Sequence, residues 1–129
     1  MVRRAGGSYS PIGMSPVWLH HPITRYGGAM LIIAGEFRMQ PGTRDQFFEA
    51  VAPMVQSTLT EPGCRAFAFT PDPDDDDLIR LWEIWDDDEA LVGHVASEHM
   101  AAWRQRYAAL PVVSRNVNKY AVSDVTPLP

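Results

Sequence analysis

The sequence predicts an α+β fold, a four-stranded antiparallel sheet with two helices on one face. Runs of apolar and aromatic residues typical of strands lie at 31–39, 64–70, 78–85 and 112–125. Two longer segments, 43–59 and 86–110, instead repeat their apolar residues at helical spacing. The resulting order is βαββαβ. Such a chain folds most simply in the ferredoxin-like arrangement, with both helices on the same side of the sheet.

The first three strand segments differ in the composition of their faces. Residues 31–39 are apolar on both faces and are followed by a Pro-Gly turn. Residues 64–70 alternate between one face with Arg65, Phe67 and Phe69 and another with Cys64, Ala66 and Ala68. Residues 78–85 place Glu83 and Trp85 on one face and Arg80 and Trp82 on the other.

The first helix is predicted from its start signal and its apolar spacing. Thr43 followed by Gln46 matches a capping box. Apolar residues then recur at helical spacing at Phe47, Phe48, Val51, Met54, Val55 and Leu59. Pro53 lies inside this segment and has no backbone N–H, so we expect a kink or a break within 49–53.

The acidic segment 71–77, between the second and third strands, ends in four adjacent aspartates. Four carboxylates invite comparison with a calcium loop. The alternate ligand spacing, the mid-loop glycine and the distal glutamate of such loops are missing. We therefore interpret the segment as a solvated hairpin turn.

The second helical segment is predicted to consist of two pieces. An acidic start at 86–89 precedes apolar spacing through Leu91, His94 and Val95, and the pattern restarts at Ser97. The second stripe comprises Met100, Trp103, Tyr107 and Leu110. Pro111 ends it, and the last strand follows at 112–125.

Composition limits the compartment and the partners. The chain has 129 residues, of which 46% are hydrophobic, enough for the core of one domain. Its net charge of -5 provides no overall positive field for a nucleic acid or an anionic membrane, and neither partner is expected. Cys64 is the single cysteine, so neither an internal disulfide nor a paired-thiolate zinc site is possible, which favours a reducing cytoplasm.

The first 29 residues differ in composition from the rest. They carry three arginines and no acidic residue, with several glycines and prolines and no sustained apolar period. We interpret residues 1–29 as a flexible tail and residues 30–125 as the folded domain. The Arg3-Arg4 pair lacks the apolar run that an export signal requires. The sequence leaves open whether Met30 is the native start.

The patterning of the sheet predicts a homodimer. An open antiparallel sheet normally shows one polar face to water, whereas the first and third strands are apolar on both faces. No further segment is available to cover the face opposite the helices, and two-fold dimers are the commonest oligomers. We expect Arg80 and Trp82 to lie at that interface, with Glu36 as a partner for Arg80.

Four motifs in a fixed order carry a family resemblance. They are the turn at 40–42, the Glu-Pro-Gly-Cys turn at 61–64, the Leu-Trp-Glu-Ile-Trp strand at 81–85 and the segment 89–99 with its two histidines. From residue 30 to about 123 the chain resembles the antibiotic biosynthesis monooxygenase (ABM) domain family, and its quinol-monooxygenase-like members, within the dimeric α+β barrel superfamily. The resemblance implies a pocket between helices and sheet, and oxygenation of phenols or quinols without a cofactor.

Membership of this superfamily does not fix the reaction, because other relatives include haem-degrading enzymes and isomerases. The haem-degrading relatives ligate iron through a histidine in the second helical segment, where this chain has Arg104, and their pocket asparagine corresponds to Gly35. The resemblance therefore does not favour haem. Many ABM relatives also carry a tyrosine at or near the position of Phe67. Because phenylalanine has no hydroxyl, this chain lacks that candidate proton donor.

His94 is the first candidate for a catalytic base. Oxygenation without a cofactor requires deprotonation of the substrate, and a histidine with an ordinary pKa of about 6.5 accepts a proton near neutral pH. His94 shares a helical stripe with Leu91 and Val95 and is expected to point toward the sheet. If Glu83 faces the helices, it is expected to orient His94. A core histidine with a structural hydrogen bond is the equally weighted alternative.

Aromatic side chains are the candidate substrate contacts. Trp85 is expected to form one wall of the pocket, with plain core packing as its alternative. The remaining substrate-contacting candidates are Phe37, Phe67, Phe69, His99, Trp103 and Tyr107. Core packing is the default interpretation of the three phenylalanines, and packing with a surface hydroxyl is the favoured one for Tyr107. His99 matches the second histidine of the family, although a surface or capping role is the favoured interpretation for it.

No metal site and no cofactor are predicted. Adjacent His20 and His21 point apart in an extended chain, and side chains five residues apart on one helix, as His94 and His99 would be, diverge by about 140°. Cys64 follows a turn with no neighbouring histidine, which favours a small buried residue over a nucleophile. The predicted function is a cofactor-independent monooxygenase. A non-catalytic dimer that binds an aromatic metabolite and an isomerase or cyclase are the alternatives.

Overall fold

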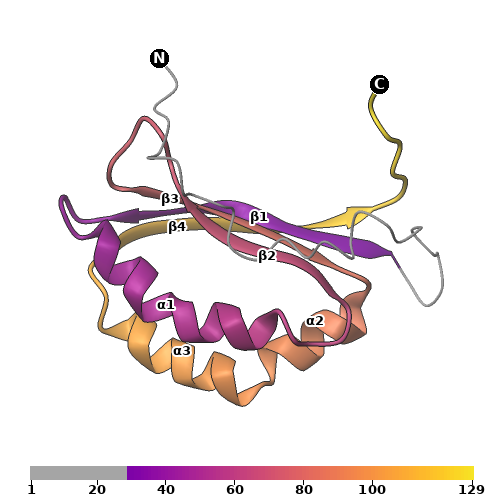
Figure 1. Ribbon diagram of the computed structural model, residues 1–129, viewed down its shortest axis with the longest axis horizontal. Coiled ribbons are helices and arrows are strands. Elements are labelled where there is room, and N and C mark those ends of the chain that lie inside the picture. The colour runs from indigo at the N-terminus through magenta and orange to yellow at the C-terminus, as the bar shows by residue number, and fades with distance from the viewer. Residues whose placement is uncertain (1–28) are drawn as a thin grey trace.

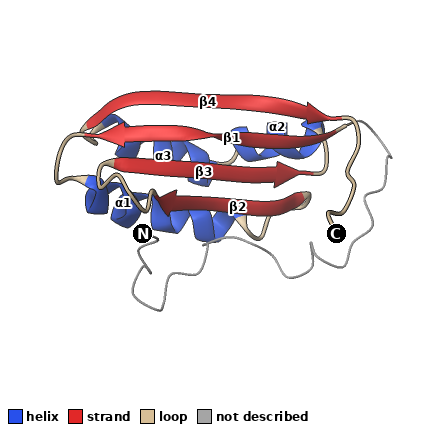
Figure 2. Cartoon of the chain, turned by 90° about the horizontal axis from the view of Figure 1, so that it is seen from above, coloured by secondary structure: helices blue, strands red, loops and turns tan. Residues whose placement is uncertain are grey.

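The computed structural model describes residues 29–129, which form one antiparallel sheet with all helices on one of its faces (Figure 1). The elements in chain order are β1 (Met30–Met39), α1 (Arg44–Thr58), β2 (Cys64–Pro71), β3 (Leu78–Trp85), α2 (Asp88–Val95), α3 (Glu98–Ala108) and β4 (Val112–Val122). The strand order is β2-β3-β1-β4, as Figure 2 shows from above. The predicted ferredoxin-like α+β fold is confirmed. The predicted tail lies outside the described residues except for its last position.

The core lies between the sheet and the helices. Phe47, Val51 and Met54 of α1 are almost fully buried, as the helical spacing predicts. They pack against the sheet, where Phe67 and Trp85 are the largest fully buried side chains. Residues this deeply buried each contribute roughly 1.5–3 kcal/mol through removal of apolar surface from water.

The start of α1 differs from the sequence prediction. Thr43 caps the helix without a side-chain hydrogen bond to it, because its Oγ1 donates to the carbonyl oxygen of Gln40 at 2.7 Å. The predicted capping box with Gln46 is therefore wrong. The expected break is also absent, since α1 continues through Pro53 from residue 44 to 58. Apolar residues buried on either side of Pro53 offset the one missing hydrogen bond.

The second helical segment is divided in two, as predicted. Asp87 caps α2 by accepting from the backbone N–H of Ala90, and Ser97 caps α3 by accepting from that of Met100. The hydroxyl of Ser97 also donates to the carbonyl oxygen of His94 at 2.7 Å. The side chain of Ser97 thus joins the end of α2 to the start of α3.

Two strands differ in detail from the prediction. A register shift between Cys64 and Ala66 pairs Cys64 with Trp85 and Ala66 with Ile84. Cys64 therefore packs toward the helices, and its predicted place on the face of Ala66 is wrong because one extra residue reverses the alternation. The strand β4 ends at Val122 and not at 125, since its last partner in β1 is Met30, the first residue of that strand.

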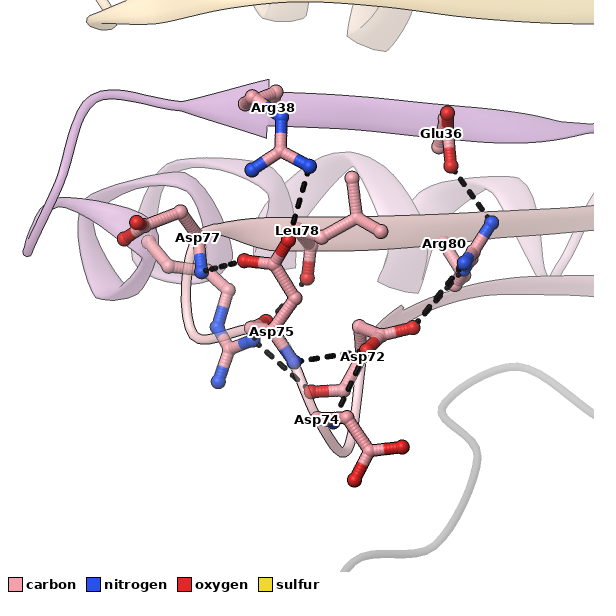
Figure 3. Close-up of polar contacts among 9 residues, drawn as sticks. Glu36, Arg38, Asp72, Asp74, Asp75, Asp77, Leu78 and Arg80 are labelled. Atoms are coloured by element: carbon pink, nitrogen blue, oxygen red, sulfur yellow. Dashed lines mark hydrogen bonds and ion pairs between the residues drawn. The ribbon is translucent and has the colours of Figure 1, made fainter.

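The segment between β2 and β3 is a hairpin turn, as predicted (Figure 3). Asp75 accepts a hydrogen bond from Arg38 at 2.9 Å, and Asp72 accepts from Arg80 at 3.3 Å. Asp72 also accepts from backbone N–H groups within the loop, which lowers the pKa of its carboxyl. Arg44 donates to three backbone carbonyl oxygens in and beside the loop. Arginine side chains and backbone N–H groups thus hydrogen-bond the carboxylates of Asp72 and Asp75 in this turn.

The sheet face opposite the helices carries the predicted pair of Arg80 and Glu36, whose side chains lie 2.7 Å apart. Trp82 is 38% exposed on this face and Tyr120 of β4 is 52% exposed. These exposed aromatic side chains lie where the sequence predicts a dimer interface, which stays a prediction.

Candidate active site

A cavity of about 280 Å³ lies between the sheet and the helices, and we call it the aromatic pocket. All seven helices and strands of the described residues contribute to its lining. The lining residues are Phe37, Met54, Phe67, Phe69, Leu81, Glu83, His94, Met100, Trp103, Arg104, Tyr107 and Arg115. Most of the wall is apolar, and its charged or titratable groups are Glu83, His94, Arg104, Tyr107 and Arg115.

Strand alternation and helix spacing explain how the aromatic side chains meet. Phe67 and Phe69 lie two residues apart on β2 and share one face, with ring centroids 5.7 Å apart. Phe37 from β1 lies 5.8 Å from Phe69 and 6.1 Å from Tyr107 of α3. Together with Trp103, these are five of the predicted substrate contacts, and the structure brings all five to one cavity.

His94 is buried at the end of α2 and lines the aromatic pocket. Its Nδ1 lies 3.1 Å from Oε1 of Glu61, in the turn that follows α1. Nε2 of His99 hydrogen-bonds the same carboxylate oxygen. The sequence prediction that His94 points inward is confirmed, while its partner is Glu61. The prediction that Glu83 orients His94 is therefore wrong.

The shared carboxylate oxygen fixes the tautomer of His94. An ionised carboxylate only accepts hydrogen bonds, so both Nδ1 of His94 and Nε2 of His99 donate to it. A neutral His94 that carries its hydrogen on Nδ1 has a free lone pair on Nε2. Burial lowers the pKa of His94, and the hydrogen bond to Glu61 acts against that change. The imidazole is thus neutral and able to accept a proton near pH 7.

Glu83 contributes a second titratable group to the pocket. Its side chain is buried, and Oε1 accepts a hydrogen bond from Nε1 of Trp85 at 2.8 Å. Burial raises the pKa of Glu83 to about 7, while the Trp85 hydrogen bond and the positive charge of Arg115 oppose that rise. A carboxyl group with this pKa exchanges protons near neutral pH, which is a property of catalytic acids and bases.

Trp85 and His99 do not line the aromatic pocket. Trp85 is fully buried, and its ring centroid lies 4.8 Å from that of His94. It therefore supports His94 and Glu83 from within the core, so its predicted place in the pocket wall is wrong. His99 binds Glu61 instead of facing the cavity, because α3 starts in a new direction after the break.

Glu61, Arg104 and Arg115 have places at the site that the sequence did not reveal. Glu61 reaches His94 across 33 positions of sequence, a contact that depends on the path of a turn. Arg115 pairs in register with Phe37 and lies with its guanidinium carbon 5.7 Å from the centroid of that ring. The register of β4 against β1, which sequence alternation alone does not fix, is the signal that places Arg115 here.

A second cavity, of about 480 Å³, is lined by Glu61 and His94 among other residues. We call it the acidic pocket because Asp86, Asp87 and Glu89 line it together with Glu61. His94 lines both cavities.

The prediction that His94 and His99 diverge is wrong. It assumes one continuous helix, whereas α2 ends at Val95 and α3 begins at Glu98. The two imidazole rings have centroids 5.9 Å apart. One ligand atom from each of Glu61, His94 and His99 lies within 4.8 Å of the others.

Cys64 is half-buried against the core, and its thiol has a pKa raised to about 12, chiefly by burial. A thiol with so high a pKa is almost entirely protonated at neutral pH and is a poor nucleophile. This agrees with its predicted role as a packing residue.

Comparison with known proteins identifies the family. Residues 30–106 match the family model described as antibiotic biosynthesis monooxygenase. The chain belongs to the antibiotic biosynthesis monooxygenase family. The ABM match covers the sheet strands β1 to β3 and nearly all of the helices, and therefore most residues of the aromatic pocket.

Solved structures share the fold of this ABM chain. A candidate antibiotic biosynthesis monooxygenase from Deinococcus radiodurans has a TM-score of 0.69 at 17% identity, covering 77% of this chain and 98% of that one. Another candidate from Nitrosomonas europaea has a TM-score of 0.68 at 20% identity, covering 79% and 98%. An uncharacterised protein from Synechocystis is 19% identical over 98 residues, which are 76% of this chain and 67% of the relative.

Among the described residues, no helix combines the length and the apolar character needed to cross a membrane.

Proposed function

We propose that the protein is a cofactor-independent monooxygenase that oxidises a phenolic, quinol or polyketide-like aromatic substrate with dioxygen. One observation carries the proposal. The aromatic pocket brings a neutral imidazole with a free nitrogen, a carboxyl group of pKa about 7 and an arginine to the same aromatic-lined cavity. Family membership supports the reaction class.

The first step is removal of a proton. Nε2 of His94 accepts a proton from the substrate, while Glu61 holds Nδ1–H and stabilises the imidazolium that forms. The positive charge of Arg115, at the rim of the same cavity, favours the resulting phenolate or enolate anion. Glu61 acts through His94 and is a positioning residue.

The electron-rich anion then reduces dioxygen. One electron passes from the anion to O₂, and the two radicals combine to form a carbon–oxygen bond and a peroxide. The peroxide O–O bond then breaks as the remaining hydrogen on the oxygenated carbon leaves as a proton and its electron pair forms the C=O bond. The distal oxygen takes up protons and leaves as water. The overall reaction is RH₂ + O₂ → RO + H₂O, which balances atoms and electrons. The apolar wall excludes bulk water from the charged intermediates.

The size of the cavity limits the substrate. Its volume of about 280 Å³ lies just below the roughly 300–1,000 Å³ typical of ligand pockets. The proposal therefore favours a substrate of one or two rings. It also includes a cytoplasmic homodimer, supported by exposed Trp82 and Tyr120 on the sheet face opposite the helices.

Dioxygen uptake by the purified, metal-stripped protein tests the proposal. Hydroquinones of one or two rings serve as the expected substrates and the three-ring anthrones test the size limit, with correction for spontaneous oxidation and with product mass determined. We expect uptake with one oxygen atom added to the product, and a loss on the order of 10²-fold or more in His94→Ala. Val92→Ala is the matched control, because Val92 is 65% exposed on the same helix.

Three outcomes contradict the proposal. Absence of uptake across the panel, combined with saturable ligand binding, indicates a non-catalytic binding protein. Product formed without oxygen indicates an isomerase or cyclase. An unchanged rate in folded His94→Ala removes His94 from the mechanism.

A further inference from the structure

Glu61, His94 and His99 form a cluster of potential metal ligands, a property that the proposed reaction does not use. Two imidazole nitrogens converge on one carboxylate oxygen, and the ligand atoms of all three residues lie within 4.8 Å of one another. Two histidines and one carboxylate are a ligand set that zinc and other divalent transition metals use in proteins.

One ligand pair has the separation that a single ion requires, and Nε2 of His99, which hydrogen-bonds the same carboxylate oxygen, must move away from that oxygen to reach the same ion. Zinc lies about 2.0–2.2 Å from nitrogen and oxygen ligands, so tetrahedral ligands are roughly 3.3 Å apart. Nδ1 of His94 and Oε1 of Glu61 are 3.1 Å apart, close to that separation. The three residues leave one tetrahedral position for water or another ligand.

The fold holds the ligands in place without an ion. Ser97 caps α3 and donates to the carbonyl oxygen of His94, which fixes the break that turns His99 toward Glu61. His94 is buried and packs against the rings of Phe67 and Trp85. Rigid support of this kind reduces the ordering that metal binding requires.

The acidic pocket supplies an access route for a cation. Glu61 and His94 line it together with Asp86, Asp87 and Glu89. Asp86 is paired with Arg65, so the excess negative charge of the cavity comes from the other carboxylates. Carboxylates around a cavity raise the local concentration of cations. Two independent observations thus agree, the convergent ligand atoms and an acidic cavity that reaches two of the three ligands, Glu61 and His94.

We propose that Glu61, His94 and His99 bind one divalent transition metal ion, with Zn²⁺ as the ion to test, at the end of the acidic pocket. Binding requires Nδ1 of His94 and Nε2 of His99 to give up their hydrogens, so the ion replaces the two hydrogen bonds to Glu61.

Isothermal titration of the metal-free full-length chain with zinc chloride tests this proposal without any substrate, so its result does not depend on the proposed oxygenase activity. We expect saturable binding with one equivalent at the cluster. Glu61→Gln and His99→Gln are each expected to weaken binding at least about tenfold. Cobalt, used as a spectroscopic substitute, is expected to give the intense visible absorption of a tetrahedral site.

Two controls separate the cluster from other ligands. Glu98→Gln removes an exposed carboxylate beside His99 and is expected to leave zinc affinity unchanged. The double variant His20→Asn, His21→Asn removes the other two histidines of the chain and is also expected to retain the site. Thermal unfolding checks each variant, and zinc is expected to raise the melting temperature of the wild-type chain.

Lack of saturable zinc binding overturns the proposal. So does binding that survives both Glu61→Gln and His99→Gln, or that disappears in the His20, His21 double variant. Any of these results leaves the cluster as a hydrogen-bonded support for His94.

Discussion

Trp85 donates a hydrogen bond from its indole N–H to the carboxylate of Glu83, two residues earlier on the same face of β3. The distance is 2.8 Å, and both side chains are buried. This contact favours the ionised form of Glu83, whereas burial favours the protonated form. The balance places the pKa of Glu83 at about 7.

Trp85→Phe is expected to raise the pKa of Glu83 above about 7, because it removes the N–H and retains an aromatic ring. A hydrogen bond to a charged group contributes roughly 1.5–3 kcal/mol, so the expected rise is on the order of one unit. Carbon-13 NMR of labelled glutamate carboxyl groups measures it. Trp82→Phe, on the opposite face, is the control. An unchanged Glu83 titration in Trp85→Phe would show that burial and the nearby charges set the pKa without this hydrogen bond.

Glu83 is also expected to make the folded state less stable as pH rises. Its pKa in the folded protein is about 7, against 4.5 for the exposed group, so the folded state binds more protons than the unfolded state between these values. The free energy of unfolding therefore falls from pH 4.5 to 7, by about 3 kcal/mol, and then levels off.

Glu83→Gln removes this titration while its amide oxygen still accepts from Trp85. Urea unfolding at pH 5 and pH 8 measures both proteins. We expect the variant to gain stability relative to the wild type as the pH is raised. A constant difference between the two proteins across this range contradicts the assignment.

Gly35 and Gly93 provide a matched pair of Gly→Ala substitutions. A Cβ at residue 35 would overlap the backbone of Asn116 and Val117 in the neighbouring strand, whereas a Cβ at residue 93 meets nothing within 4 Å. We expect Gly35→Ala to destabilise the fold by at least about 1–3 kcal/mol. Gly93→Ala, in α2, is expected to stabilise it by about 0.5–1 kcal/mol. Urea unfolding compares them. Equal effects would show that β4 can move away from residue 35.

By the sequence resemblance, Gly35 stands where the haem-degrading relatives carry a pocket asparagine. The close approach of β4 leaves no room for that side chain without a backbone shift. At the position of the iron-ligating histidine of those relatives, this chain has Arg104. Its guanidinium donates to the carbonyl oxygen of Val95 at 2.6 Å. Residue 104 therefore offers no imidazole to ligate iron, and residue 35 offers no side-chain amide to a haem pocket.

Local patterns predicted the fold because they repeat along each element. Alternation placed Phe67 and Phe69 on the helix-facing side of β2, and the restart of the pattern at Ser97 gave the division between α2 and α3. The site was less predictable where it depends on irregular backbone. One extra residue in β2 places Cys64 on the helix-facing side of the sheet. The turn after α1 places Glu61 within hydrogen-bond distance of His94. Neither event leaves a periodic signal in the sequence.

Zinc and proton abstraction are expected to compete for His94. An ion on Nδ1 takes the lone pair of that nitrogen, so a neutral ring then carries its hydrogen on Nε2. That nitrogen becomes a donor and no longer accepts a proton from a substrate in the aromatic pocket.

Dioxygen uptake by the metal-free chain is therefore expected to fall in proportion to zinc occupancy and to recover when a chelator is added. His99→Gln, which weakens the site but retains His94, is expected to require at least about tenfold more zinc for the same loss. Glu98→Gln is expected to respond like the wild type. Full uptake at zinc concentrations that saturate the site by calorimetry would mean that Nε2 of His94 is not the base, because zinc at Nδ1 and a free lone pair on Nε2 exclude one another in a neutral imidazole.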